Sequence, residues 1–211
     1  MQWLRWAAPV VAAAAVFLLP ALQASAPFSP VQRWSVAELA GEIAQAATAG
    51  PGRQDQSSAT NLRQLLRHAR ELQQWLPAES QRNRAALDRA LLLALPIPFA
   101  VLLAGIAALL SLAATALERR WPLRACAAAG LAASLFAMAA SWWMTRSARR
   151  AVGQALAQAQ HSFGGLPLGL DWNRLQAGLT RPLGLVPQAG LLVLALAFLA
   201  MLAAPAPARP R

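Results

Sequence analysis

Few side chains in this sequence could carry chemistry, and their spacing does not form a catalytic set. Histidine occurs at His68 and His161 only, and Cys126 is the single cysteine. One cysteine excludes an intrachain disulfide, a CxxC motif and a thiolate metal cluster. Either the two histidines are exposed and isolated, or they share a metal site with Glu71 or Asp171. We expect the first of these, and therefore no metal-binding residue.

Neither the carboxylates nor the known catalytic motifs indicate an active site. Glu71 lies four residues after Arg67 and Asp88 lies four residues after Arg84, which is the spacing of ion pairs on a helix surface. The chain has no H-E-x-x-H motif, no G-x-S-x-G motif, no P-loop and no glycine-rich dinucleotide turn. We therefore predict that the protein is not an enzyme and has no catalytic or cofactor-binding residue.

The elements that would position these residues are dominated by four long apolar runs. The runs cover residues 7–24, 90–117, 125–145 and 183–204, and none contains Asp, Glu, Lys, Arg or His. A bilayer core about 30 Å thick needs roughly 20 helical residues to cross it. The runs therefore predict four transmembrane helices. Proton relays, ion pathways and voltage sensors leave charges at membrane depth, so these activities are disfavoured.

Composition supports a membrane protein and argues against a nucleic-acid partner. Hydrophobic residues make up 57% of the chain and charged residues 13%, whereas soluble domains carry roughly 25% charged residues. The net charge is +11, and all 19 cationic side chains are arginine. The arginines are scattered through every polar segment and no nucleic-acid motif is present. We expect them to anchor helix ends and to face anionic lipid headgroups.

The predicted fold is an all-α integral membrane protein, with four transmembrane helices and a helical cap formed by two loops on one side. Residues 1–26 are the predicted N-terminal signal anchor, 27–89 an extramembrane helical loop, 90–145 a transmembrane hairpin, 146–182 a second extramembrane loop, and 183–211 a transmembrane helix with a disordered tail.

A cleaved signal peptide is the alternative for the first segment. Ala24-Ser25-Ala26 resembles a small-residue cleavage site, but Pro27 follows it directly. The apolar stretch is also longer than a signal-peptide core of roughly 7–15 residues, so we expect an uncleaved anchor.

The first loop contains two predicted helices. Residues 36–47 follow Ser35, a good N-cap residue, and carry Glu38 in the first turn. Residues 61–75 show apolar side chains at three- and four-residue spacing, which is typical of an amphipathic helix. We interpret its apolar face as a partner-binding surface, formed by Leu62, Leu65, Leu66, Ala69, Leu72 and Trp75.

The third run and the second loop are predicted to be continuous. The run is rich in small residues that let helices approach closely, and residues 147–160 extend the helical pattern beyond it. Gln188, at the start of the fourth run, is one amide that could contact a ligand or a partner. Tryptophans prefer the headgroup level, which predicts five membrane-interface anchors: Trp3, Trp6, Trp121, Trp142 and Trp143.

The arginines favour two opposite orientations of the chain in the membrane. The arginine-rich connection at 118–124 and the signal-anchor shape favour a cytoplasmic N-terminus, with both long loops periplasmic. The arginines of the second loop favour the opposite orientation. We expect the first arrangement, in a bacterial cytoplasmic membrane.

The sequence therefore favours a non-catalytic tetraspan accessory or scaffold subunit of a larger membrane complex, for which a bacterial respiratory or photosynthetic complex would be a natural host. Its partners would be other integral membrane proteins and a bilayer with anionic headgroups. The alternative is a small membrane sensor or transporter for a hydrophobic ligand such as a lipid or a quinone, which would need no charge within the membrane.

Overall fold

The computed structural model describes residues 2–25, 31–48, 96–117, 120–163 and 184–204, together with residues 171, 174, 177, 178 and 180. The predicted amphipathic helix at 61–75 lies outside these residues. So do its apolar face (Leu62, Leu65, Leu66, Ala69, Leu72 and Trp75), His68 and Glu71.

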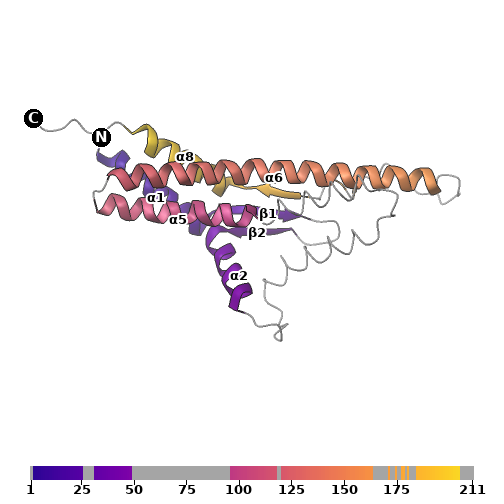
Figure 1. Cartoon of the computed structure of the whole chain (residues 1–211), viewed down its shortest axis with the longest axis horizontal. Helices are drawn as coiled ribbons and strands as arrows, with labels where there is room; N and C mark the ends of the chain where they lie inside the picture. The colour runs from indigo at the N-terminus through magenta and orange to yellow at the C-terminus, as the bar shows by residue number, and fades with distance from the viewer. Residues whose placement is uncertain are drawn as a thin grey trace, which may run out of the picture.

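Four helices form an elongated bundle in the described part of the chain (Figure 1). They are α1 (Gln2–Leu18), α5 (Pro96–Ala116), α6 (Arg120–Phe163) and α8 (Ala189–Ala203). Helices α5 and α6 form an antiparallel hairpin, α1 packs against α5 and α8, and α6 also packs against α8. The protein is mostly helical, as predicted. By length and composition, α5 and the stretch Trp121–Gln158 of α6 could each cross a membrane.

The first and fourth apolar runs are not continuous helices, which corrects the prediction for residues 7–24 and 183–204. Helix α1 ends at Leu18 and the chain continues as strand β1 (Pro20–Ser25), while strand β3 (Gly184–Pro187) precedes α8. Pro20 has no backbone N–H and clashes with the preceding helical turn, so the helix stops before it. The resulting helices are short, with 17 residues in α1 and 15 in α8.

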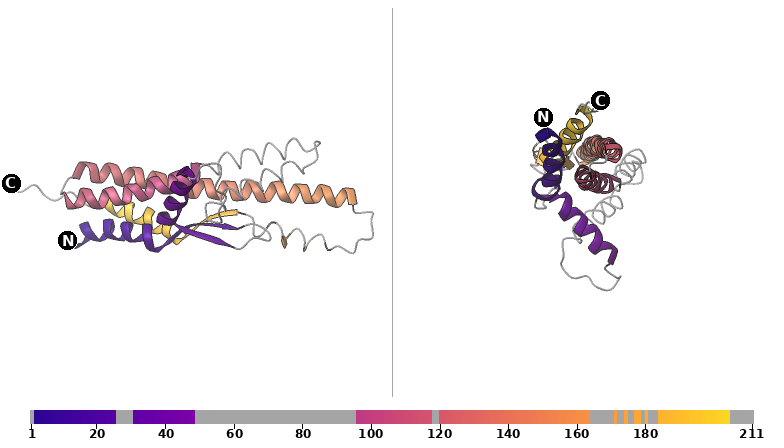
Figure 2. Two further views of the ribbon diagram at one scale, coloured as in Figure 1. Left: turned by 90° about the horizontal axis from the view of Figure 1, so that it is seen from below. Right: turned by 90° about the vertical axis from the view of Figure 1, so that its left-hand side faces the viewer.

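The strands form a small antiparallel sheet that the all-α prediction did not include. Strand β2 (Gln32–Ser35) completes the order β2-β1-β3. Leu22 of β1 lies opposite Trp34 on one side and Pro187 on the other. Figure 2 shows the sheet along the flank of α6, with β1 directly after α1 and β3 directly before α8. The sheet therefore ties both chain-terminal helices to the longest helix.

Helix α2 (Val36–Thr48) follows β2 directly and confirms the helix predicted at 36–47. The Glu38 N–H donates to Ser35 Oγ at 3.2 Å, and the Ser35 N–H donates to Glu38 Oε2 at 2.7 Å. This reciprocal pair is a capping box, which satisfies two backbone donors at the helix start. Helix α2 packs against α5 at Gly105, where a Cβ would collide with Val36.

Thr145 of α6 covers the outer edge of the sheet. Its hydroxyl donates to the Leu185 carbonyl at 2.9 Å and accepts the Leu185 N–H at 3.1 Å, as a neighbouring strand would. Gly184 next to it has φ +153°, and a Cβ there would collide with Thr145. One side chain thus satisfies both backbone groups of Leu185 and fixes the sheet to α6.

Replacing Thr145 with valine should lower stability, because the Leu185 N–H and C=O then lose their partners. An unsatisfied buried polar group costs about 1–3 kcal/mol. Thr115→Val is the matched control, since the Thr115 hydroxyl only returns to the Ser111 carbonyl four residues back. Thermal unfolding of both variants in detergent, followed by circular dichroism, should show a lower midpoint for Thr145→Val alone. Equal midpoints would show that the Leu185 contacts add nothing.

The inside of the bundle is rich in small side chains, although Phe198, Leu191 and Ile97 are also fully buried, and large apolar side chains cover the outside. Ala104, Ala108, Ala127 and Ala137 are fully buried. Three buried serines each donate to the carbonyl four residues back within their own helix, at 2.6–2.8 Å: Ser111, Ser134 and Ser141. The exposed set includes Phe99, Leu103, Ile106, Leu110, Leu135, Phe136, Leu192, Leu196 and Leu199. A water-soluble helical bundle would carry polar side chains on that outer surface.

Candidate functional site

A groove on α6, beyond its apolar part, gathers three arginines. We call it the arginine groove. Its volume is about 610 Å³, and its described lining residues are Trp142, Thr145, Arg146, Arg149, Arg150, Gly153, Gln154, Ala157 and Thr180. All but Thr180 come from α6. The spacings of three and four residues place them on one broad face of that helix.

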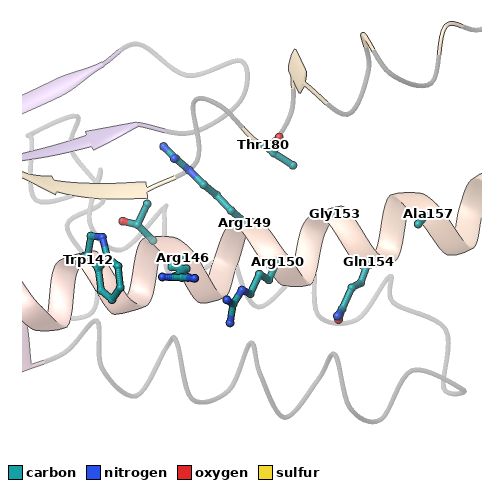
Figure 3. Close-up of a pocket in the computed structure, with 9 residues that line it drawn as sticks. Trp142, Arg146, Arg149, Arg150, Gly153, Gln154, Ala157 and Thr180 are labelled. Atoms are coloured by element: carbon teal, nitrogen blue, oxygen red, sulfur yellow. The ribbon is translucent and has the colours of Figure 1, made fainter.

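The cationic side chains spread across the groove (Figure 3). The Arg146 guanidinium carbon lies 5.1 Å from the centroid of the Trp142 ring, which is cation–π distance. Arg149 reaches toward the side on which Thr180 lies, whereas Arg150 and Gln154 point to the opposite side. The three arginine side chains are exposed. Arg149 therefore lies on a different side from Arg150 and Gln154, and an anion beside Arg150 would also meet the Gln154 amide.

Tryptophans lie at both ends of the apolar part of α6, which precedes the groove residues in the sequence. The rise from Trp121 to Trp143 is about 33 Å at 1.5 Å per residue, which matches a hydrocarbon core of about 30 Å. Trp6, Trp121, Trp142 and Trp143 are all exposed, and the side chain of Trp3 lies outside the described set. Their interface role stays a prediction, and it would place the arginine groove one turn beyond the hydrocarbon.

The residues considered for metal chemistry are not brought together. His161 is exposed near the end of α6, and Asp171 is exposed and pairs with Arg174 at 3.1 Å. Within the described ranges, no group of three or more His, Cys, Asp or Glu side chains is placed to hold a metal ion.

Gln188, considered above as a ligand contact, makes structural bonds. Its side-chain amide donates to Gln23 Oε1 at 3.0 Å, and its backbone N–H donates to the Ala21 carbonyl at 2.9 Å. Arg33 Nε donates to the same Gln23 oxygen at 3.3 Å. These bonds link the start of α8 to the sheet.

Glu42 is a partly buried carboxyl beside the sheet. The Trp34 indole N–H donates to Glu42 Oε1 at 2.9 Å, while the buried Oε2 has no hydrogen-bond partner among the described atoms. Burial raises the pKa of Glu42, the bond from Trp34 opposes this, and the nearby Glu38 charge raises it further. The carboxyl is therefore protonated more readily than an exposed glutamate.

The arginine groove was not predicted from the sequence, although the spacing of its arginines indicated it. Arg146, Arg149 and Arg150 were counted only as charges of a loop. Their three- and four-residue spacing directly after Trp142 and Trp143 would have placed them on one helical face at the membrane boundary. The comparisons with protein-family models, with curated proteins and with solved structures found no match to this chain.

Proposed function

We propose that the protein is a non-catalytic tetraspan scaffold subunit, which packs laterally against other integral membrane proteins. The observation that carries this proposal is the apolar outer surface of a bundle whose interior is rich in small side chains. Helices associate in membranes through small residues that allow close backbone approach, because lipid provides no hydrophobic drive between them. Large apolar side chains then face the lipid tails or a partner helix.

The exposed apolar surface is too extensive for a free protein in water. Soluble monomers rarely expose contiguous apolar patches above a few hundred Å². Here large apolar side chains point outward from most turns of α5 and α8 and from the part of α6 up to Trp143, as in the set from Phe99 to Leu199 given above. A bilayer with embedded partner helices is the environment that suits such a surface.

Four spans are compatible with the short lengths of α1 and α8. At 1.5 Å per residue these helices are about 26 Å and 23 Å long, slightly less than the hydrocarbon thickness. A short span is accommodated by local thinning of the bilayer at modest cost. Backbone groups exposed to hydrocarbon are not tolerated, so the sheet belongs at headgroup level, beside the arginine groove.

The arrangement of the helices supports the proposed topology. The start of α1, the end of α5, the start of α6 and the end of α8 lie at one end of the bundle (Figure 1). We propose that the opposite end, toward which α6 extends, is periplasmic. Helix α6 continues for about 30 Å beyond Trp143. It forms a rigid arm on that side to which partners can attach.

Purification in mild detergent, with mass spectrometry of the co-purifying proteins, tests the scaffold proposal. We expect an integral membrane protein at fixed stoichiometry. Leu65→Asp and Leu72→Asp should each remove it, because a buried leucine contributes about 1.5–3 kcal/mol. Gln74→Asp, on the polar face of the same predicted helix, should retain it. A chain that remains alone and transports a lipid or a quinone would instead support the alternative function.

A further inference from the structure

We propose that the arginine groove binds the phosphate of an anionic glycerophospholipid headgroup. The inference rests on the proposed function in one respect, namely that α6 crosses a bilayer. It goes further by assigning a specific lipid site to residues of the chain that otherwise count only as surface charges.

Charge and donor geometry favour a phosphate. Arg146, Arg149 and Arg150 lie within two turns of α6, and no carboxylate is among the described lining residues. Guanidinium groups present paired N–H donors that match phosphate oxygens, and such charge-assisted bonds are stronger than neutral ones. Arg150 and Gln154 point to the same side of α6, where a phosphate can accept N–H bonds from both. That side of the groove therefore suits a compact anion with several acceptor oxygens.

The shape of the groove also fits a headgroup. Its volume of about 610 Å³ lies within the range of small-molecule sites, roughly 300–1,000 Å³. Trp142 forms the end nearest the apolar part of α6, and its ring is in contact with the Arg146 guanidinium. An indole at this position offers a flat apolar surface to the glycerol region, while the arginines beyond it face the phosphate.

An apolar track leads from the groove down the same side of α6, which favours a lipid over free phosphate. Leu135 lies seven residues, or two helical turns, before Trp142 on that face, and its side chain is exposed. The neighbouring Phe136 is exposed as well. Acyl chains attached to a phosphate in the groove can therefore lie against these side chains, whereas inorganic phosphate would make no use of them.

The test compares lipid binding by the full-length chain and two double variants. Native mass spectrometry from mild detergent would measure retention of phosphatidylglycerol and phosphatidylcholine. Arg146→Gln/Arg150→Gln removes two groove arginines. Arg120→Gln/Arg124→Gln removes two charges at the same four-residue spacing, at the other end of the same helix. Each arginine near an anionic surface contributes a factor of about five in binding.

We expect the unmodified chain to retain phosphatidylglycerol more than tenfold better than phosphatidylcholine. The groove variant should lose this preference, and the control variant should keep it. Equal losses in both variants would show that binding follows overall charge and would overturn the proposal. If the groove variant does not fold, the single variant Arg150→Gln must weaken phosphatidylglycerol retention about fivefold, and unchanged retention would overturn it.

Inorganic phosphate provides the second arm. The lipid assignment predicts that phosphate at the concentration of a matched chloride control does not displace phosphatidylglycerol. Displacement at low millimolar phosphate would assign the groove to a soluble anion instead. A chain that is extracted from membranes by alkaline carbonate would contradict the scaffold proposal itself. A membrane-embedded chain without lipid preference would contradict only the assignment of the groove.

Discussion

Ile106→Arg should prevent stable insertion of the chain. Ile106 is at the centre of α5, and 54% of its surface is exposed on the outside of the bundle. A charged side chain at the bilayer centre costs about 2.5–3.5 kcal/mol on insertion scales. The same substitution on a water-facing surface changes stability by about 0.5 kcal/mol or less. The measurement is the fraction of chain that resists alkaline carbonate extraction, together with its total accumulation in the membrane.

Leu117→Arg is the matched control for this prediction. Leu117 follows the last turn of α5 and is 70% exposed. A long cationic side chain at a helix end can reach the headgroups, so this variant should accumulate normally. Normal accumulation of Ile106→Arg would mean that the outer face of α5 meets water or a polar partner, and that α5 does not cross the bilayer as proposed.

Gly130→Val should strongly destabilise the inside of the bundle. A Cβ at Gly130 would overlap the ring of Phe198, which is fully buried between α6 and α8. The two helices cannot easily move apart, because α6 also packs against α5 and β3, and α8 also packs against α1. Overpacking a tight core costs about 1–3 kcal/mol, and valine adds two methyl groups beyond the Cβ, so we expect the upper end of this range. The readout is the thermal midpoint in detergent.

A nearby position and a compensating change make this prediction specific. Ala132→Val adds similar bulk on an exposed face of the same helix and should leave the midpoint within 1–2 °C, since exposed changes cost about 0.5 kcal/mol or less. Phe198→Leu combined with Gly130→Val should recover part of the loss, because residues in contact are not additive. Simple addition of the two effects would show that the ring is not what excludes a side chain at Gly130.

Local signals in the sequence predicted much of the helical structure. The apolar runs at 90–117 and 125–145, with a short connection between them, indicated the α5–α6 hairpin. The helical pattern at 147–160 indicated the extension of α6, which the structure continues to Phe163. Ser35 and Glu38 indicated the start of α2. Each of these signals is contained in one turn of chain or in one continuous run, so a single sequence is enough to detect it.

The sheet and the arginine groove depend on contacts that are distant in sequence. Strands β1 and β3 are short segments inside apolar runs, where periodicity cannot distinguish a strand from a helix. They pair with each other across a long stretch of sequence, and Thr145 satisfies the outer edge of β3 from a third element. The groove likewise needs Thr180 beside α6. The strand pairing leaves no mark in the local pattern of the residues that form it, whereas the arginine spacing on α6 does.

The pairing of β1 with β3 can form only late in synthesis, because β3 is translated long after β1. Ser25 and Gly184 face each other across these strands, although they are 159 positions apart. At roughly 5–20 residues per second, β1 leaves the ribosome on the order of ten seconds before its partner. Until then its edge is open to other chains, which is an aggregation hazard. Translation of β3 therefore closes the sheet, and a ribosome that stops before residue 184 releases a chain in which one edge of β1 is unpaired.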